Sequence, residues 1–139
     1  MLCQDIMKTD VRCVTPDTSV AEAAALMRDE GIGFLPVCDE THSVVGVLTD
    51  RDIAIRVVAE NEAADQPVGR FMTPAAVTCH AGEDLGAAQD LMGEMQVSRI
   101  MCLDDNGQLA GVISLSDLAL ADEDAAITLR NVSLREARA

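Results

Sequence analysis

The hydrophobic pattern in the first half of the chain changes period several times, and each change predicts an element. Residues 15–31 carry apolar side chains at helical spacing, and Ser19 followed by Glu22 fits the capping box of a helix N-terminus. Gly31 follows the last periodic position, where helices commonly stop. The pattern therefore predicts a helix that begins near Ser19 and ends before Gly31.

Shorter apolar runs on either side of this helix are typical of strands. These runs are residues 11–14, 34–38 and 43–49, and a polar turn separates the last two. Helical spacing returns at residues 50–60. The first half of the chain is thus predicted to run strand, helix, strand, strand, helix.

The second half of the chain repeats this order of elements about 65 residues later. The octet GVLTDRDI at residues 46–53 returns as GVISLSDL at residues 111–118. The elements predicted in this half are again a strand, a helix, two strands and a helix, at residues 77–79, 83–94, 99–103, 109–114 and from 115 onward. A unit of about 60 residues barely makes a core of its own. We therefore expect an α/β (α+β) fold of two β-α-β-β-α units packed through their sheets with pseudo-two-fold symmetry.

The repeat divides the chain into two predicted domains, residues 1–60 and residues 71–121. Residues 61–70 are polar and contain Pro and Gly, which is typical of a linker. Residues 122–139 form a C-terminal tail whose pattern predicts no element clearly.

Charge limits the partners of the protein. The formal net charge is −14 and the sequence pI is about 4.2. Because nucleic acids and anionic membranes attract basic surfaces, this charge argues against both as partners. No run approaches the roughly 18 apolar residues of a membrane span, and no leader peptide opens the sequence, so we expect a cytoplasmic protein.

Both predicted long helices carry a stripe of Ala and Met. Its members are Ala23, Ala24, Met27, Ala88 and Met92. Small residues allow close approach of another surface, and the stripe is extensive for one small core. We therefore expect a homodimer that forms through these helix faces.

Cysteine and histidine give weak signals of chemistry. The cysteines are Cys3, Cys13, Cys38, Cys79 and Cys102. They lack a C-x-x-C pair and lie mostly in apolar runs, which favours buried reduced thiols over a metal or redox role. His42 falls in a predicted turn and His80 in a predicted loop, where histidines are seldom catalytic. We expect neither a catalytic residue nor a bound metal.

The repeated octet places a glycine, a hydroxyl and a carboxylate at fixed spacing. The three positions are Gly46, Thr49 and Asp52 in the first octet and Gly111, Ser114 and Asp117 in the second. A glycine admits a bulky group to the backbone, and the carboxylate can accept hydrogen bonds from a ribose diol. The start of the following helix attracts phosphate. The spacing therefore suits a nucleotide.

A simpler interpretation of each octet needs no ligand. In this interpretation, Thr49 or Ser114 caps the following helix, and Asp52 or Asp117 interacts favourably with the helix dipole. For one octet this structural interpretation is favoured. Two octets inside a matching larger repeat favour the ligand interpretation instead.

Residues 1–121 resemble a tandem pair of CBS domains, the cystathionine-β-synthase-type regulatory module also called a Bateman module. The matching motifs lie at residues 5–7, 14–20, 33–37 and 46–53 of the first repeat, and at residues 71–74 and 111–118 of the second. Together these motifs are far more specific than one G-x-x-[ST]-x-x-D match.

The resemblance implies a sensor without catalytic activity. Such pairs bind adenosine-containing ligands such as AMP, ADP, ATP, NAD or S-adenosylmethionine, usually as homodimers. No cofactor is implied, apart from magnesium with ATP. An effector enzyme or transporter in trans would respond to the change of shape. The alternative is an interaction module whose clefts bind no ligand.

The family pattern, carried over residue by residue, implies two clefts. The principal cleft would contain Met7, Arg12, Ile32, Gly33, Arg99, Gly111, Ser114 and Asp117. The second cleft would contain Gly46, Thr49, Arg51, Asp52, Thr73, Ala76, Val77 and Val97. Phe34 occupies the position of Arg99 in the first repeat, so the second cleft lacks that phosphate ligand. Met101 likewise replaces the proline that the first repeat has at Pro36.

The charge predicts which nucleotide binds best. With a net charge of −14 and few cations near either cleft, AMP is expected to bind more tightly than ATP, unless magnesium offsets the phosphate charge. Competition titrations with and without magnesium measure this ranking. Tighter binding of ATP in both conditions would show that the electrostatic argument is wrong.

Overall fold

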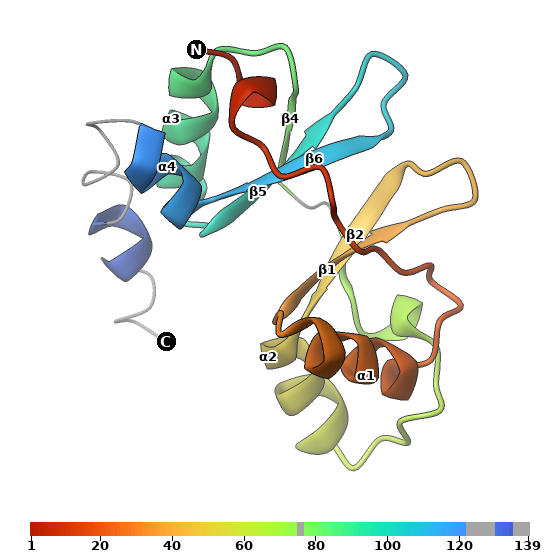
Figure 1. Ribbon diagram of the computed structural model, residues 1–139. Helices are drawn as coiled ribbons and strands as arrows, with labels where there is room; N and C mark the ends of the chain where they lie inside the picture. The colour runs from red at the N-terminus through yellow and green to blue at the C-terminus, as the bar shows by residue number, and fades with distance from the viewer. Residues whose placement is uncertain (75–76, 122–129, 135–139) are drawn as a thin grey trace. The chain divides into compact units, whose positions relative to one another are not determined.

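The fold is mixed α/β, as predicted. The computed structural model describes residues 1–74, 77–121 and 130–134 of the chain (Figure 1). It contains two three-stranded sheets, each covered by helices. Within the described ranges, no helix combines the length and apolarity needed to cross a membrane.

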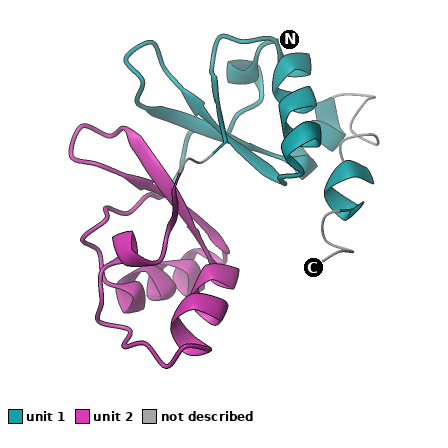
Figure 2. Ribbon diagram, turned by 180° about the vertical axis from the view of Figure 1, so that it is seen from behind, with its two compact units in different colours: residues 1–11, 77–139 teal, residues 12–76 magenta. Residues whose placement is uncertain are grey.

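The chain forms two compact units that do not follow the sequence repeat (Figure 2). Unit 1 consists of residues 1–11 together with residues 77–139, and unit 2 consists of residues 12–76. The predicted domains, residues 1–60 and 71–121, follow the repeat along the sequence, and they stay a prediction. The same holds for the expected packing of one sheet on the other.

The sheet of unit 2 is antiparallel throughout, in the order β1-β2-β3. Strand β1 (Phe34–Cys38) and strand β2 (Val44–Thr49) confirm the two predicted apolar strands. The third strand, β3 (Thr73–Pro74), pairs with β2 and has only two residues. Its shortness explains why the sequence pattern did not indicate it.

Helix α1 (Val20–Glu30) covers this sheet and has the predicted ends. The Ser19 side-chain oxygen accepts a hydrogen bond from the backbone N–H of Glu22 at 3.1 Å, as an N-cap does. Gly31 adopts φ 67° and its N–H closes the last turn of the helix. Both boundary predictions are therefore confirmed.

The predicted strand at residues 11–14 is wrong in extent. Only Val14 pairs there, in an isolated parallel bridge to Val37. The backbone N–H of Val14 donates to Pro36 O at 3.0 Å, and Cys38 N–H donates to Val14 O at 2.8 Å. Because the chain up to residue 11 packs in unit 1, little of the run remains to form a strand in unit 2.

The helix predicted after β2 is present, but most of it does not have the α-helical period. Helix α2 covers only Asp50–Asp52, and a π-helical segment, η2 (Ile53–Val58), continues it. The N–H of Ala59 donates to the carbonyl of Ala54, five residues earlier, at 2.9 Å. The segment places Val57 in the core, where it is 2% exposed.

Unit 1 has the predicted strand and helix order. Its elements are η1 (Cys3–Asp5), β4 (Thr78–His80), α3 (Leu85–Met95), β5 (Arg99–Leu103), β6 (Leu109–Ser114) and α4 (Leu115–Ala121). Strand β5 is central, parallel to β4 and antiparallel to β6. His80 is the last residue of strand β4, so the prediction that it lies in a loop is wrong.

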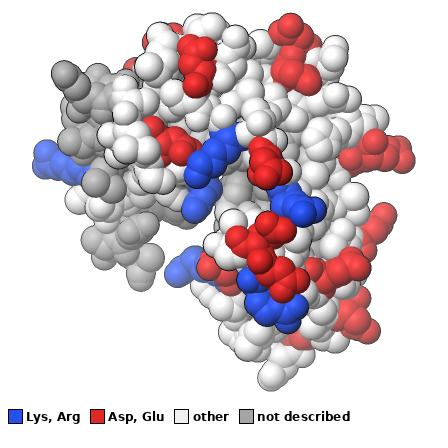
Figure 3. All heavy atoms as spheres, in the orientation of Figure 1, with Lys and Arg blue, Asp and Glu red and all other residues white. Residues whose placement is uncertain are grey.

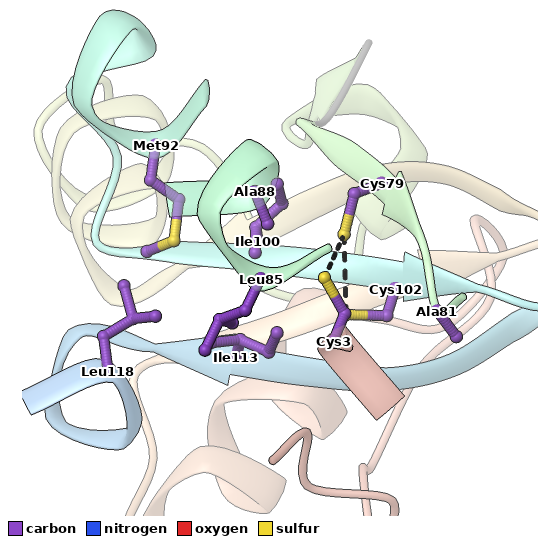
Figure 4. Close-up of a cluster of buried hydrophobic side chains, with 10 residues drawn as sticks. All are labelled: Cys3, Cys79, Ala81, Leu85, Ala88, Met92, Ile100, Cys102, Ile113 and Leu118. Atoms are coloured by element: carbon purple, nitrogen blue, oxygen red, sulfur yellow. Dashed lines mark hydrogen bonds between the residues drawn. The ribbon is translucent and has the colours of Figure 1, made fainter. Parts of the chain in front are cut away.

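One face of each sheet packs against the helices to form the core. Figure 4 shows this cluster in unit 1, where side chains of α3, α4, β5 and β6 point toward one another. Its members are Cys3, Cys79, Ala81, Leu85, Ala88, Met92, Ile100, Cys102, Ile113 and Leu118.

The helical stripe of Ala and Met belongs to these cores. Ala23 is 0% exposed in unit 2, and Ala88 and Met92 are 1% and 0% exposed in unit 1. The expectation that the stripe faces a second copy is therefore wrong for these residues. The sheet needs a cover of its own, and small side chains let the helix lie close to it.

The prediction of buried free thiols is confirmed for every cysteine except Cys13, which is only partly buried. Cys79 Sγ lies 3.9 Å from Cys3 Sγ and 3.7 Å from Cys102 Sγ. Burial, followed by the neighbouring Cys79, raises the pKa of Cys3 to about 12. Burial also raises the pKa of Cys38 to about 12. These thiols are protonated near neutral pH, so they are poor nucleophiles.

The short segment that opens each sequence repeat pairs with a strand of the other repeat. Lys8 exchanges two backbone hydrogen bonds with Val112 of β6, at 2.9 Å and 3.0 Å. Thr73 pairs in the same way with Val47 of β2. Each compact unit therefore contains a piece of both repeats, which sets the unit boundaries.

A glycine in each receiving strand makes room for this segment. A Cβ on Gly111 would lie 2.7 Å from the carbonyl oxygen of Lys8, and a Cβ on Gly46 would lie 2.7 Å from that of Thr73. The sequence interpretation assigned both glycines to the approach of a ligand. In the structure, the group that approaches each glycine is the backbone of the chain itself.

The segment at residues 61–70, predicted as a linker, packs on unit 2. Val68 is 0% exposed, and its N–H donates to Thr18 O at 2.7 Å. The N–H of Gly69 donates to Pro16 O at 2.8 Å. The segment ends in a turn of 3-10 helix, η3 (Val68–Arg70). It is thus an ordered part of the unit.

Replacing Gly111 by Ala tests the close approach in unit 1. The new Cβ would clash with Lys8 O and with Met7 Cγ, which lies at 2.8 Å. We expect the free energy of unfolding in urea to fall by about 1–3 kcal/mol. Gly93→Ala on α3 is the control, because its Cβ would meet only the Asn131 side chain and Ala favours helix. Equal losses in both variants would contradict the assignment.

Alkaline pH tests the buried thiols. Their pKa values are raised in the folded state, so unfolded thiols ionise first and stability is lost as pH rises from about 9 toward 12. Each such thiol contributes at most about 1.4 kcal/mol per pH unit. The chain has no tyrosine and Lys8 is its only lysine, so few other groups titrate there. Urea denaturation with reductant and chelator measures the slope, which Cys3→Ala should reduce. An unchanged slope in that variant would exclude Cys3.

Candidate functional site

The hydroxyl and carboxylate of the first octet form a reciprocal cap at the start of α2. Asp52 N–H donates to Thr49 Oγ1 at 3.1 Å, and Thr49 N–H donates to Asp52 Oδ2 at 3.0 Å. Both contacts satisfy backbone donors that the first turn of a helix leaves unpaired. The structural interpretation of the octet is thus realised in this unit.

The second octet forms the same cap at the start of α4. Ser114 N–H donates to Asp117 Oδ2 at 2.9 Å, and Asp117 N–H donates to Ser114 Oγ at 3.3 Å. The Ser114 hydroxyl also donates to Asp117 Oδ2 at 2.9 Å. The Oδ2 atom of Asp117 is therefore fully engaged by the cap.

The other oxygen of each carboxylate faces a cation. Asp117 Oδ1 lies 3.7 Å from Lys8 Nζ, and Asp52 Oδ1 lies 3.7 Å from Arg56 Nε. The two aspartate side chains are 12% and 13% exposed. The cap therefore fixes one oxygen and presents the second toward solvent and a positive charge. Such an oxygen can accept hydrogen bonds from a ligand hydroxyl.

The two cations are held differently. Lys8 is carried by the segment on β6, and its side chain is 71% exposed. Arg56 lies on η2 and also donates to the backbone carbonyls of Phe71 and Met72, at 3.2 Å and 3.4 Å. Lys8 is consequently freer to change its partner than Arg56.

The residue opposite each hydroxyl also distinguishes the units. Arg99 of β5 lies directly across from Ser114 of β6 in the strand register. Phe34 of β1 lies directly across from Thr49 of β2. The predicted asymmetry, a cation beside one hydroxyl and an aromatic ring beside the other, is therefore present in the sheets.

The structure brings together part of each predicted cleft. Unit 1 holds five of the residues assigned to the principal cleft, namely Met7, Arg99, Gly111, Ser114 and Asp117. Unit 2 holds five of those assigned to the second, namely Gly46, Thr49, Arg51, Asp52 and Thr73. Thr73 Oγ1 donates to Asp52 Oδ1 at 3.4 Å, so these two predicted members of the second cleft are in contact; the predicted place of Thr73 around the base stays a prediction.

The remaining predicted members belong to the other unit in each case. Arg12, Ile32 and Gly33 lie in unit 2, and Val77 and Val97 lie in unit 1. Ala76 lies outside the described residues. The membership of these residues in a shared cleft stays a prediction.

Sequence reasoning missed two cations. Arg51 was assigned to the second cleft, whereas the ion pair that Asp52 forms in the described chain is with Arg56. The signal was available, since the i to i+4 spacing from Asp52 to Arg56 places both side chains on one helix face. Lys8 gave no such signal, because its nearness to Asp117 depends on the pairing with β6.

The surface charge agrees with a site built from single cations. On the face drawn in Figure 3, basic side chains lie beside acidic ones and form no broad basic patch. Several are paired, among them Arg12 with Glu30 at 3.3 Å and Arg70 with Glu62 at 3.3 Å. On this face the cations therefore stand singly or in ion pairs.

Comparison with known proteins gives close relatives along most of the chain. The protein is 35% identical over 133 residues to the CBS domain-containing protein YhcV of Bacillus subtilis, and the match covers 94% of both chains. Among solved structures, Hypoxic Response Protein I, solved with two coordinated zinc ions, has a TM-score of 0.78 and 29% identity. That match covers 88% of this chain and 99% of the other.

Two further neighbours were solved with adenosine-type ligands. The CBS domain pair of protein MJ0100, in complex with 5′-methylthioadenosine and S-adenosyl-L-methionine, has a TM-score of 0.75 and 26% identity, over 86% of this chain and 94% of the other. CBSX2 in complex with AMP has a TM-score of 0.75 and 25% identity, over 93% and 98%. The family model described as CBS domain matches residues 3–59 and again residues 68–124. With both repeats matched, the chain belongs to the CBS domain family.

Proposed function

We propose that this protein is a regulatory module that binds an adenosine-containing ligand, AMP foremost, beside Ser114 and Asp117. One observation supports the proposal most directly. In each unit, one oxygen of an aspartate accepts a hydrogen bond from the start of a helix, and the other oxygen faces a cation. The solved complexes of CBS proteins with AMP and with methylthioadenosine and S-adenosylmethionine support this ligand class.

The geometry of unit 1 suits a ribose phosphate. Asp117 Oδ1 is positioned to accept hydrogen bonds from a vicinal diol, since the cap holds the carboxylate in place. Lys8 would then leave Asp117 and turn to the phosphate, a change that its 71% exposed side chain permits. Arg99, across from Ser114, would supply the second positive charge.

Unit 2 is the weaker candidate because its cation is already engaged. Arg56 is held by two backbone carbonyls as well as by Asp52. Phe34 stands where unit 1 has Arg99, so no second positive charge lies across from Thr49. A phosphate beside Thr49 would therefore lack the compensation that the Asp117 site offers.

Signalling would use the segment that carries Lys8. Lys8 pairs with β6, and the chain runs from Lys8 directly into unit 2. A ligand that breaks the ion pair between Lys8 and Asp117 therefore acts on the segment that carries Lys8. A ligand shifts a conformational equilibrium only by its differential affinity for the two states. We propose that a homodimer of this protein presents the change to a partner enzyme or transporter in the cytoplasm, without catalysis by this chain.

One observation favours a second candidate, an interaction module without a ligand. Both carboxylates already satisfy backbone N–H groups, so the octets stabilise the fold even when nothing binds. A thermal-shift panel of adenine nucleotides separates the candidates, since a ligand at 100 times its Kd stabilises a fold by about 2.7 kcal/mol. A panel without any shift would favour the interaction module.

Replacing Asp117 by Asn tests the site. The side chain keeps its size, but the charged acceptor for the diol is lost, so AMP affinity in calorimetry should fall about 10- to 150-fold. Asp52→Asn should have a smaller effect. Asp90→Asn, an exposed position on α3 with the same change of charge, is the matched control. Loss of binding in Asp52→Asn alone would show that the principal site is in unit 2.

The single lysine allows a direct readout of the same site. Reductive methylation with labelled formaldehyde marks Lys8 and the N-terminal amine, which NMR distinguishes. AMP should shift the Lys8 resonance in the wild type and leave it unchanged in Asp117→Asn. AMP binding by calorimetry without any shift at Lys8 would contradict its proposed role.

A further inference from the structure

Three soft donor atoms meet in unit 2, away from the two capped carboxylates. They are Cys13 Sγ, Cys38 Sγ and a ring nitrogen of His42, all within 4.8 Å of one another. Cys13 Sγ lies 4.0 Å from His42 Nδ1. Among the described residues, this is the one group of at least three cysteine, histidine and acidic side chains close enough to share a metal ion.

The backbone brings the two cysteines together. Cys38 is the last residue of β1, and Cys13 directly precedes Val14. Val14 N–H donates to Pro36 O at 3.0 Å, and Cys38 N–H donates to Val14 O at 2.8 Å. These two hydrogen bonds fix the segment of Cys13 beside the end of β1, so the proximity of the thiols does not depend on flexible side chains alone.

A tight turn brings the histidine to the same point. Asp39 Oδ1 accepts hydrogen bonds from the N–H groups of Thr41 at 2.9 Å and Ser43 at 3.0 Å. His42 N–H donates to Asp39 O at 3.0 Å. The turn therefore holds the backbone of His42 on both sides.

The second repeat contains the same turn and serves as an internal reference. Asp104 Oδ1 accepts from Asn106 N–H at 2.9 Å and from Gln108 N–H at 3.0 Å. Gly107 N–H donates to Asp104 O at 3.0 Å, the same bond that His42 makes in unit 2. The two turns are equivalent, and Gly107 occupies the position of His42.

This position requires a left-handed backbone. Gly107 has φ 77° and His42 has φ 64°. Glycine adopts such a φ without strain, whereas a residue with a Cβ does so at a cost. The first repeat thus places a histidine where the second places the residue that suits the turn. A ligand role for the imidazole ring would account for this histidine.

The other two donors are also confined to the first repeat. In the register of the repeat, Thr78 and Leu103 stand where unit 2 has Cys13 and Cys38. All three ligands are therefore present together in one unit and absent together from the other. Because all three donors occur in one repeat and none occurs at the equivalent positions of the other, we expect them to act together.

We propose that Cys13, Cys38 and His42 bind a zinc ion. Two thiolates and an imidazole are preferred zinc ligands, and magnesium and calcium prefer oxygen. Tetrahedral zinc places such donors about 3.6–3.8 Å apart, so the atoms need to close in by only tenths of an ångström from 4.0 Å and by about 1 Å at most.

The site is open on one side. Cys38 is 2% exposed, Cys13 is partly buried, and His42 is exposed at the surface. A fourth ligand, water or a donor from a partner, therefore has access to the ion. The ion would clamp the start of unit 2 to the turn between β1 and β2, a role independent of nucleotide binding at Asp117.

Metal analysis of the full chain tests the proposal. Protein purified with reductant and dialysed against one equivalent of zinc should retain about one ion per chain, and cobalt in its place should give the strong visible bands of a tetrahedral thiolate complex. His42→Asn keeps a residue that tolerates positive φ, and Cys13→Ser removes one thiol. Each should weaken zinc affinity at least about 100-fold.

His80→Asn is the matched control. His80 Nε2 lies 2.7 Å from Asp105 Oδ1, outside the cluster of soft donors, so this variant should keep the zinc of the wild type. Equal zinc content in the wild type, Cys13→Ser and His42→Asn would overturn the proposal. So would a disulfide between Cys13 and Cys38 that mass spectrometry finds in protein purified with reductant, because it would leave no thiolates to bind the ion.

His42→Gly separates binding from folding. In the presence of a chelator its Tm should rise by about 2–4 °C, because glycine relieves the strained φ. Zinc at 100 times its Kd should raise the Tm of the wild type by about 5–10 °C and leave His42→Gly unchanged. A variant whose Tm rises with zinc as much as the wild type would show that His42 is not a ligand.

Discussion

The contact between each opening segment and the glycine of the opposite strand determines how this chain is assembled. The carbonyl oxygens of Lys8 and Thr73 occupy the space that a side chain would take on Gly111 and Gly46. Lys8 belongs to one repeat and Gly111 to the other, and Thr73 and Gly46 are related in the same way, so each repeat extends the sheet of the other at its edge. The compact units, the third strand of unit 2 and the position of the only lysine all follow from this pairing.

The same pairing gives the capped aspartates a second use. A capping carboxylate ordinarily serves the helix alone. Here the cap engages Oδ2, and the neighbouring cation lies near Oδ1, so one side chain can hold the fold and still accept a ligand. The structural and the ligand interpretations of the octet therefore do not exclude each other. Their coexistence also means that a loss of binding in a variant must be compared with its stability.

Local sequence signals predicted most of the fold. The helix ends at Ser19 and Gly31 and the strands predicted at residues 34–38 and 43–49 depend on interactions within a few residues, and all are confirmed. The features that the sequence did not predict depend on contacts between residues distant in sequence. One is the ion pair of Lys8 with Asp117, and another is that the strand predicted at residues 11–14 is reduced to the single bridge of Val14 with Val37. The π-helical segment after Asp52 could not be predicted either, because in so short a segment the hydrophobic pattern does not distinguish a π-helix from an α-helix. In the candidate site, the capped pairs could be predicted, whereas the cations depend on tertiary structure.

The exchange of opening segments has a consequence for how such a chain can arise and be divided. A fragment with one repeat would present a strand with a bare glycine and an opening segment without its own strand to bind. Two such fragments could satisfy both needs by exchanging segments, as in a domain-swapped dimer. The tandem chain then corresponds to a covalently joined form of that dimer. If the connection between the repeats were cut, each half would still depend on the other for the segment that pairs with its glycine-containing strand.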